Sequence, residues 1–311
     1  MASVSIELAR ASRDRAAARP FVDWPTLAVA AGTYAAFGLL TWFYHALPWW
    51  LVLPLGGYVV CLHGSLQHEA THGHPFRRRW LNSLLIGPSL WLWLPYGEYR
   101  WAHLRHHRDE WLTHPAEDPE SYYIAQARWR RMGWLHRALR RAMNTAAGRL
   151  LLWPAYVVIA VLVNAVRRIL AGDRDHIRWW ALHVPAAGVV VAWVVWVCGI
   201  PFWAYVLLFA WPGLSLTLLR SFAEHRAAEA VGHRTAIIEA GPVMSLLYLN
   251  NNLHAVHHAD PASPWHRRWA LYRKRRTAIL AENGGYWFGG YGEILRRYLF
   301  TPREPVPHPF M

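Results

Sequence analysis

The stretch Asn250-Asn251-Asn252-Leu253-His254-Ala255-Val256-His257-His258 places three histidines at positions i, i+3 and i+4. On an α-helix these positions share one face, so three imidazole rings would point in the same direction. Neutral imidazole is the commonest protein ligand of transition metals. The stretch therefore predicts a helix that presents metal ligands on one side.

Two further histidine clusters occur earlier in the chain. His103-Leu104-Arg105-His106-His107 repeats the spacing, and His68-Glu69-Ala70-Thr71-His72 places two imidazoles at i and i+4. A further candidate, His225, follows a long apolar run. With this histidine content, chance would supply roughly 0.07 copies of His-x-x-His-His, the usual risk of false motif matches. We predict nine metal-ligating and catalytic residues: His68, His72, His103, His106, His107, His225, His254, His257 and His258.

Nine imidazoles are enough to hold two metal ions and leave open positions for a reactant. Nitrogen-rich sites suit iron, copper and zinc, and the spacing alone does not choose among them. A pair of redox metals would activate O2, whereas a pair of zinc ions would favour hydrolysis. Cys61 and Cys198 lie in apolar runs and are predicted to be buried free thiols, so an all-cysteine zinc site is excluded.

The composition is typical of a membrane protein. Hydrophobic residues make up 54% of the 311 residues against 17% charged residues, and Trp occurs 21 times. Tryptophan is enriched at membrane interfaces. Five apolar runs approach the ~20 residues that a bilayer requires: about 26–46, 49–67, 150–168, 180–199 and 202–220.

If all the histidine clusters bind one centre, an even number of membrane crossings must separate any two of them. The run Leu81 to Leu94 is too short and too broken by Gly87 and Pro88 to cross. Three long runs separate His107 from the later histidines. We expect the run 150–168 to lie in the interface, because it ends in Arg167 and Arg168. The predicted fold class is therefore an all-α integral membrane protein with four transmembrane helices in two hairpins, interfacial helices, and a cytosolic cap that carries the histidine clusters.

The distribution of charge predicts the orientation in the membrane. The two outer turns, near 46–50 and 198–202, contain no charged residue, so every Arg and Lys falls on the side of the clusters. The positive-inside rule makes that side the cytoplasm. We expect a single domain over 1–311 in a bacterial inner membrane, with site and termini cytoplasmic. Residues 1–22 should be a flexible N-terminus and 301–311 an extended tail.

The chain is strongly basic, with 33 Lys and Arg against 19 Asp and Glu and a formal charge of +14. Basic chains bind nucleic acid, anionic lipid or acidic proteins. The sequence has no helix-turn-helix or zinc-finger pattern, and we exclude nucleic acid as a partner. The arginines between 108 and 148 are expected to face lipid headgroups or an acidic protein partner.

Several residues near the histidine clusters have two possible roles. Acids beside the clusters either orient ligand imidazoles or are solvated surface charges: Glu69, Asp109, Glu110, Glu224 and Asp260. Asn250, Asn251 and Asn252 either bond a metal-bound water or, for at least one of them, cap a helix. Four histidines outside the pattern are expected to be structural: His45, His63, His74 and His183.

The order of the three clusters resembles the three histidine boxes of the integral-membrane fatty acid desaturase and hydroxylase superfamily, and His225 resembles that family's extra ligand between boxes two and three. The segments His103–Glu110, Asp118–Tyr123 and Asn250–Pro261 are similar to a hydrocarbon-oxygenase branch related to rhizopine-catabolism proteins. The resemblance covers about residues 60–305. It implies two non-haem iron ions, O2 as co-substrate and an external electron donor.

The resemblance implies O2-dependent oxidation of an unactivated C–H bond in a fatty acyl or other lipid or hydrocarbon chain, with desaturation favoured. The sequence lacks a four-cysteine rubredoxin module, a His-Pro-Gly-Gly motif and a dinucleotide fingerprint. We therefore expect a separate donor, such as ferredoxin or rubredoxin with its reductase. Three alternatives stay open: hydroxylation or oxidative decarboxylation, a zinc-dependent membrane hydrolase, and a non-enzymatic metal or haem carrier.

Overall fold

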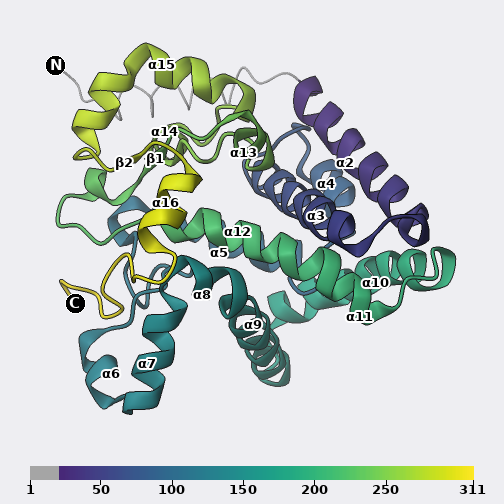
Figure 1. Cartoon of the computed structure of the whole chain (residues 1–311), viewed down its shortest axis with the longest axis horizontal. Helices are drawn as coiled ribbons and strands as arrows, with labels where there is room; N and C mark the ends of the chain where they lie inside the picture. Colours follow the sequence, from purple (N-terminus) through teal and green to yellow (C-terminus); the bar gives the residue numbers. More distant parts are fainter. Residues whose placement is uncertain (1–20) are drawn as a thin grey trace. The chain divides into compact units, whose positions relative to one another are not determined.

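The computed structural model describes residues 21–311, and most of the segment expected to be flexible lies outside these residues. The described chain is mostly helical (Figure 1). Its strands are β1 (Ile237–Ile238) and β2 (Trp287–Phe288), which pair in parallel. The all-α fold class is thereby confirmed.

Contacts divide the described chain into two compact units. The membrane unit comprises residues 21–101 and 153–218, and the histidine unit comprises 102–152 and 219–311. The boundary between the units falls inside two continuous helices, α5 (Tyr96–His106) and α12 (Trp211–Glu224). The expectation of a single domain over 1–311 stays a prediction.

The remaining helices of the membrane unit are mostly long. They are α2 (Trp24–Trp42), η1 (Tyr44–Ala46), α3 (Trp49–Thr71), α4 (Arg79–Ile86), α9 (Trp153–Leu170), α10 (Arg174–Ala192), η3 (Trp193–Val197), α11 (Phe202–Tyr205) and η4 (Val206–Ala210). The segments η3 and η4 are π-helical turns. They prolong α10 and join α11 to α12, so two long helical rods run over Arg174–Val197 and Phe202–Glu224.

The helices of the histidine unit are mostly short. They are η2 (Asp109–Trp111), α6 (Gln126–Arg131), α7 (Trp134–Met143), α8 (Ala146–Leu151), η5 (Val231–Arg234), α13 (Pro242–Leu247), α14 (His254–Ala259), α15 (Trp265–Glu282) and α16 (Tyr291–Tyr298). The segment after α16 forms no helix or strand, and the extended tail stays a prediction. The segment is anchored, because Ile124 donates to Val306 O at 3.0 Å and accepts from His308 N at 2.9 Å.

Four helices of the described chain are long and apolar enough to cross a membrane: Trp49–Thr71, Trp153–Leu170, Arg174–Val197 and Phe202–Glu224. Four transmembrane helices were predicted from the sequence, so the number agrees. One of the four helices is a different one from that predicted. The set includes α9, which we expected at the interface, and omits α2, which covers most of the run 26–46. Tryptophan, proline and tyrosine residues, together with three threonines and two glycines, lower the mean hydropathy of α2.

One contact between distant histidines bears on the number of membrane crossings. The Nε2 atoms of His106 and His225, both in the histidine unit, lie 3.0 Å apart. An even number of crossings must therefore separate these residues, yet three of the candidate spans lie between them. The turn between α9 and α10 contains Asp173 and adjoins Arg174, whereas the turn before α11 carries no charge. The interfacial position of α9 therefore stays a prediction, supported by charge.

Small residues bring α3 close to the segment α11–η4–α12. A Cβ on Gly57 would lie 2.8 Å from Pro212 Cβ, and one on Gly213 would lie 2.5 Å from Val60 Cγ1. Glycine at such contacts lets helix backbones approach closely, which is how helices associate where lipid removes the hydrophobic driving force. On the other side, α2 packs along α3 (Figure 1).

Replacing Gly56 by Ala should destabilise the membrane unit. The new methyl group would lie 2.6 Å from Leu208 O and 2.8 Å from Phe209 Cδ1. Overpacking of this kind costs typically ~1–3 kcal/mol, so the thermal unfolding midpoint in detergent should fall. Gly38→Ala in α2 is the matched control, because nothing lies within 4 Å of its Cβ position. Equal midpoints for the two variants would contradict the close packing.

Single cysteines would locate α9. In a Cys61→Ala, Cys198→Ala background, Ala171→Cys in the α9–α10 turn should react with a membrane-impermeant maleimide from the same side as Glu229→Cys in the histidine unit. Phe202→Cys should react only from the opposite side. If Ala171→Cys and Glu229→Cys react from opposite sides, α9 crosses the bilayer and the proposed topology is wrong.

Candidate metal centre

Four imidazoles meet in the histidine unit. His106 lies on α5, His225 follows α12, and His254 and His258 lie on α14; one nitrogen from each ring lies within 4.8 Å of the others. Neighbouring Nε2 atoms are 3.0 Å apart for His106 and His225, 2.9 Å for His225 and His254, and 3.2 Å for His254 and His258. The predicted spacing of i and i+4 on one helix face is thereby confirmed for box three.

The outer nitrogen of each of these rings faces a hydrogen-bond acceptor. The distances from Nδ1 are 2.9 Å to Asp118 for His106, 3.0 Å to Asp109 for His258, 3.3 Å to the carbonyl oxygen of Arg234 for His225, and 3.3 Å to both Asn251 and Glu224 for His254. An acceptor at Nδ1 favours the tautomer with its proton there. The lone pair of each Nε2 is then free to bind a metal at the centre.

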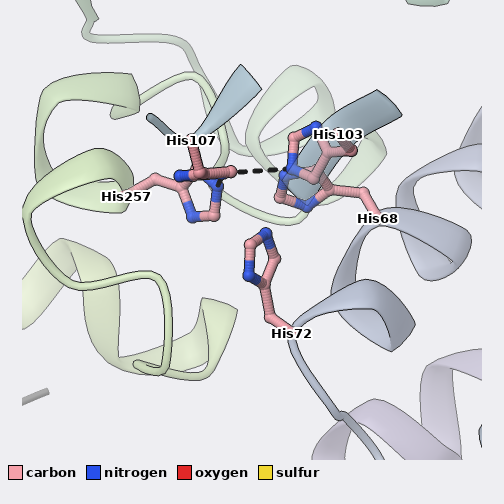
Figure 2. Close-up of side chains that lie close together, drawn as sticks. All are labelled: His68, His72, His103, His107 and His257. Carbon is pink, nitrogen blue, oxygen red and sulfur yellow. Dashed lines mark hydrogen bonds between the residues drawn. The ribbon is translucent and has the colours of Figure 1, made fainter. Parts of the chain in front are cut away.

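A second group of imidazoles includes those of His103, His107 and His257, which also lie in the histidine unit (Figure 2). The Nε2 atom of His107 lies 3.1 Å from that of His103 and 3.0 Å from that of His257. Glu120 Oε1 lies 2.9 Å from His103 Nδ1 and has the same role as the acceptors above. These three rings repeat the convergent arrangement of the first group.

His68 and His72 lie at the C-terminal end of α3 in the membrane unit, and Figure 2 draws them with the three rings above. Their ring centroids are 5.0 Å apart, as expected for i and i+4 on one helix. His68 Nδ1 lies 3.3 Å from Glu69 Oε1. The spacing inside box one therefore also brings its two imidazoles together.

Burial keeps most of these rings uncharged. Desolvation and neighbouring imidazoles lower the pKa of His225 and His254 well below the ordinary value. Desolvation also lowers the pKa of His258, although Asp109 opposes the shift. His106 differs: desolvation lowers its pKa, but the Asp118 and Glu120 carboxylates outweigh this and raise it to about 9. Neutral rings are the form that binds metal.

The three asparagines shape the turn before α14. Leu249 and Asn250 have positive φ values of 46° and 54°, which reverses the chain after α13. The capping expectation was wrong, because the N-cap of α14 is Leu253 and no side chain caps it. Asn250 Nδ2 instead donates to Trp265 O at 2.9 Å. Asn252 Nδ2 donates to Ile238 O at 2.7 Å, so the turn is held from outside the helix.

Of the five acids expected near the clusters, Glu69, Asp109 and Glu224 contact imidazoles. Glu110 is exposed and Asp260 is buried at the end of α14. Asp118 and Glu120 were not identified from the sequence as imidazole partners, although the segment that contains them follows box two. The four histidines expected to be structural lie beside other groups: His45 by Cys198 O, His63 by Tyr34, His74 by Asp23 and His183 by Leu92 O.

His225 belongs to no histidine box, and its backbone is held by distant residues. Its carbonyl oxygen accepts from Tyr122 OH at 2.8 Å and from Arg303 Nη2 at 2.5 Å. Arg303 also bonds Tyr122 and donates to Tyr286 OH at 2.5 Å. The buried guanidinium therefore ties the segment after α16 to a candidate ligand, and no motif in the sequence indicated this.

Replacing Asp118 by Asn should weaken metal binding while leaving the fold intact. The amide can present its NH2 group to His106 Nδ1 and so favour the wrong tautomer. Loss of such a partner typically costs about 10–100-fold in metal affinity, measured by competition with a chelator. Glu117→Gln is the control, since Glu117 pairs with Arg105. Equal affinities in both variants would contradict the role of Asp118.

Comparison with known proteins agrees with this geometry. The family model for fatty acid desaturases matches residues 44–290, which include all nine candidate ligands. No individually curated protein matches the chain. Because the match covers most of the sequence, the chain belongs to the fatty acid desaturase family, a family of membrane oxidoreductases.

Proposed function

We propose that the two histidine groups each hold one iron ion, and that the protein desaturates a fatty acyl or other lipid or hydrocarbon chain with O2. The observation that carries the proposal is the convergence of Nε2 atoms while the Nδ1 atoms face acceptors. The family supports oxidation of the desaturase or hydroxylase type. All nine predicted histidines are assigned as ligands, with His68 and His72 completing the group of His103, His107 and His257.

The separations between nitrogens support iron over zinc. At a metal–nitrogen distance of about 2.1 Å, ligands at right angles lie roughly 3.0 Å apart and tetrahedral ligands roughly 3.4 Å apart. Two of the neighbouring Nε2 separations around His225 and His254, 3.0 and 2.9 Å, are closer to right angles, and the third, 3.2 Å, lies midway between the two geometries. Tetrahedral geometry is typical of structural zinc. Nitrogen ligands at right angles suit a metal of higher coordination number with room for O2.

The side chains around the groups have a separate role in the proposed reaction. When bound, two iron ions would supply O2 activation, which side chains alone do not provide. Asp118, Asp109 and Glu120 hold the outer nitrogens and balance the added positive charge. The desaturation removes two hydrogens from adjacent carbons; with two electrons from a donor and two protons, O2 is reduced to two water molecules.

The electron donor is proposed to be a separate acidic protein of the ferredoxin or rubredoxin type, supplied by its reductase. Helix α15 follows box three and exposes Arg267, Arg273, Lys274 and Arg276. Opposite charge raises the rate of encounter between proteins. By the positive-inside rule, we place this surface and both histidine groups on the cytoplasmic side of a bacterial inner membrane.

The direct test combines metal analysis with product analysis. Purified protein should contain two iron ions per chain, consume O2 with reduced ferredoxin and convert acyl lipids to unsaturated products. His257→Ala should lose bound iron and turnover, whereas His266→Ala on α15 should retain both. Full turnover by His257→Ala would overturn the ligand assignment.

The products separate the alternatives. An alcohol or a shortened hydrocarbon would replace desaturation with hydroxylation or decarboxylation by the same centre. Bound zinc, with hydrolysis and no O2 consumption, would overturn the proposal in favour of a hydrolase.

A further inference from the structure

The hairpin formed by α6 and α7 is the most basic segment of the histidine unit. Between Gln126 and Met143 the chain has six arginines and no acid. They are Arg128, Arg130, Arg131, Arg137, Arg140 and Arg141. None of the nine candidate ligands lies in this segment, so neither the metal centre nor the proposed reaction accounts for it.

One face of α7 is apolar and exposed. The exposed fraction is 79% for Trp134, 65% for Leu135 and 48% for Leu139. At 100° per residue these side chains, with Ala138 among them, fall within an arc of roughly 140°. The arginines lie outside this arc. An exposed apolar stripe flanked by arginine is the pattern of a helix that lies in a membrane interface.

The hairpin is held rigidly to the rest of its unit. Trp129 is buried against Ile124 and Val306. The guanidinium groups of Arg137 and Arg141 stack over Trp129, with Cζ 5.8 and 5.6 Å from the ring centroid. Arg137 also donates to Trp129 O at 3.1 Å. The apolar face of α7 is therefore presented outward by contacts on its opposite side.

The chain itself brings a bilayer within reach of α7. Nine residues lie between Met143 and Trp153, where α9 begins, and six of them form α8. Helical residues rise 1.5 Å each and extended ones at most ~3.6 Å, so the connection spans at most about 25 Å. Helix α9 is one of the four helices apolar enough for a membrane, and its side chains Ile159 and Val166 are 61% and 57% exposed.

We propose that α7 lies in the headgroup region of an anionic lipid leaflet, with Trp134, Leu135 and Leu139 in the acyl layer and the flanking arginines at lipid phosphates. Charge complementarity selects the anionic leaflet, because the segment from Gln126 to Met143 contains six arginines and no acid. The short connection to α9 favours lipid over a soluble acidic protein. The proposal does not depend on the metal or the reaction.

The test places a polarity-sensitive fluorophore, NBD, on Leu135→Cys in the Cys61→Ala, Cys198→Ala background. The full chain is reconstituted in nanodiscs of phosphatidylcholine with or without phosphatidylglycerol. NBD at 135 should show blue-shifted emission and severalfold stronger quenching by a nitroxide on the acyl chain than NBD on His136→Cys. Residue 136 is adjacent in sequence but lies on the other face of α7, and its side chain is exposed.

Two results would overturn the proposal. One is equal quenching at positions 135 and 136. The other is protection of position 135 only after an acidic ferredoxin is added, which would assign the face to a protein partner. Arg128→Gln with Arg131→Gln should reduce the quenching at 135 in phosphatidylglycerol nanodiscs while bound metal is unchanged. Quenching that is independent of both lipid charge and these arginines would refute the anionic requirement.

Discussion

Buried imidazoles can converge through Nε2 only if hydrogen-bond acceptors hold their Nδ1 atoms. The arrangement of the histidine unit depends on these hydrogen bonds. His106 and His258 have carboxylates at Nδ1, whereas His225 has a backbone carbonyl. A buried polar atom without a partner is costly, so these acceptors stabilise the rings as well as orienting them. Asp118, Asp109 and Arg234 come from separate segments of the chain, and these segments of the histidine unit are consequently packed around the centre.

Bilayer geometry imposes the second constraint. The segment α4 is eight residues long, so boxes one and two must share one side of the membrane. The contact between His106 and His225 extends this to the later ligands. Histidines from distant parts of the sequence can thus meet on one side of a membrane, provided that the crossings between them are even in number.

Local spacing predicted the site more completely than hydropathy predicted the spans. The i, i+3, i+4 pattern is set by a single helix turn, and α14 presents His254 and His258 as expected. Asp118, Glu120 and Arg303 act across many residues of intervening chain, and no periodicity records such contacts. Hydropathy does not decide between α2 and α9 as the fourth crossing helix, since length and apolar content do not distinguish a crossing helix from one that lies along the interface.

The hydrogen bond between Arg303 and the carbonyl oxygen of His225 has a consequence for the order of events during synthesis and folding. Ribosomes synthesise the chain from its N-terminus, and Arg303 follows all nine histidines. The hydrogen bond from Arg303 to the carbonyl of His225 therefore forms after every candidate ligand has been made. During translation, the carbonyl of His225 therefore lacks this hydrogen bond until the segment beyond α16 has been made and has docked.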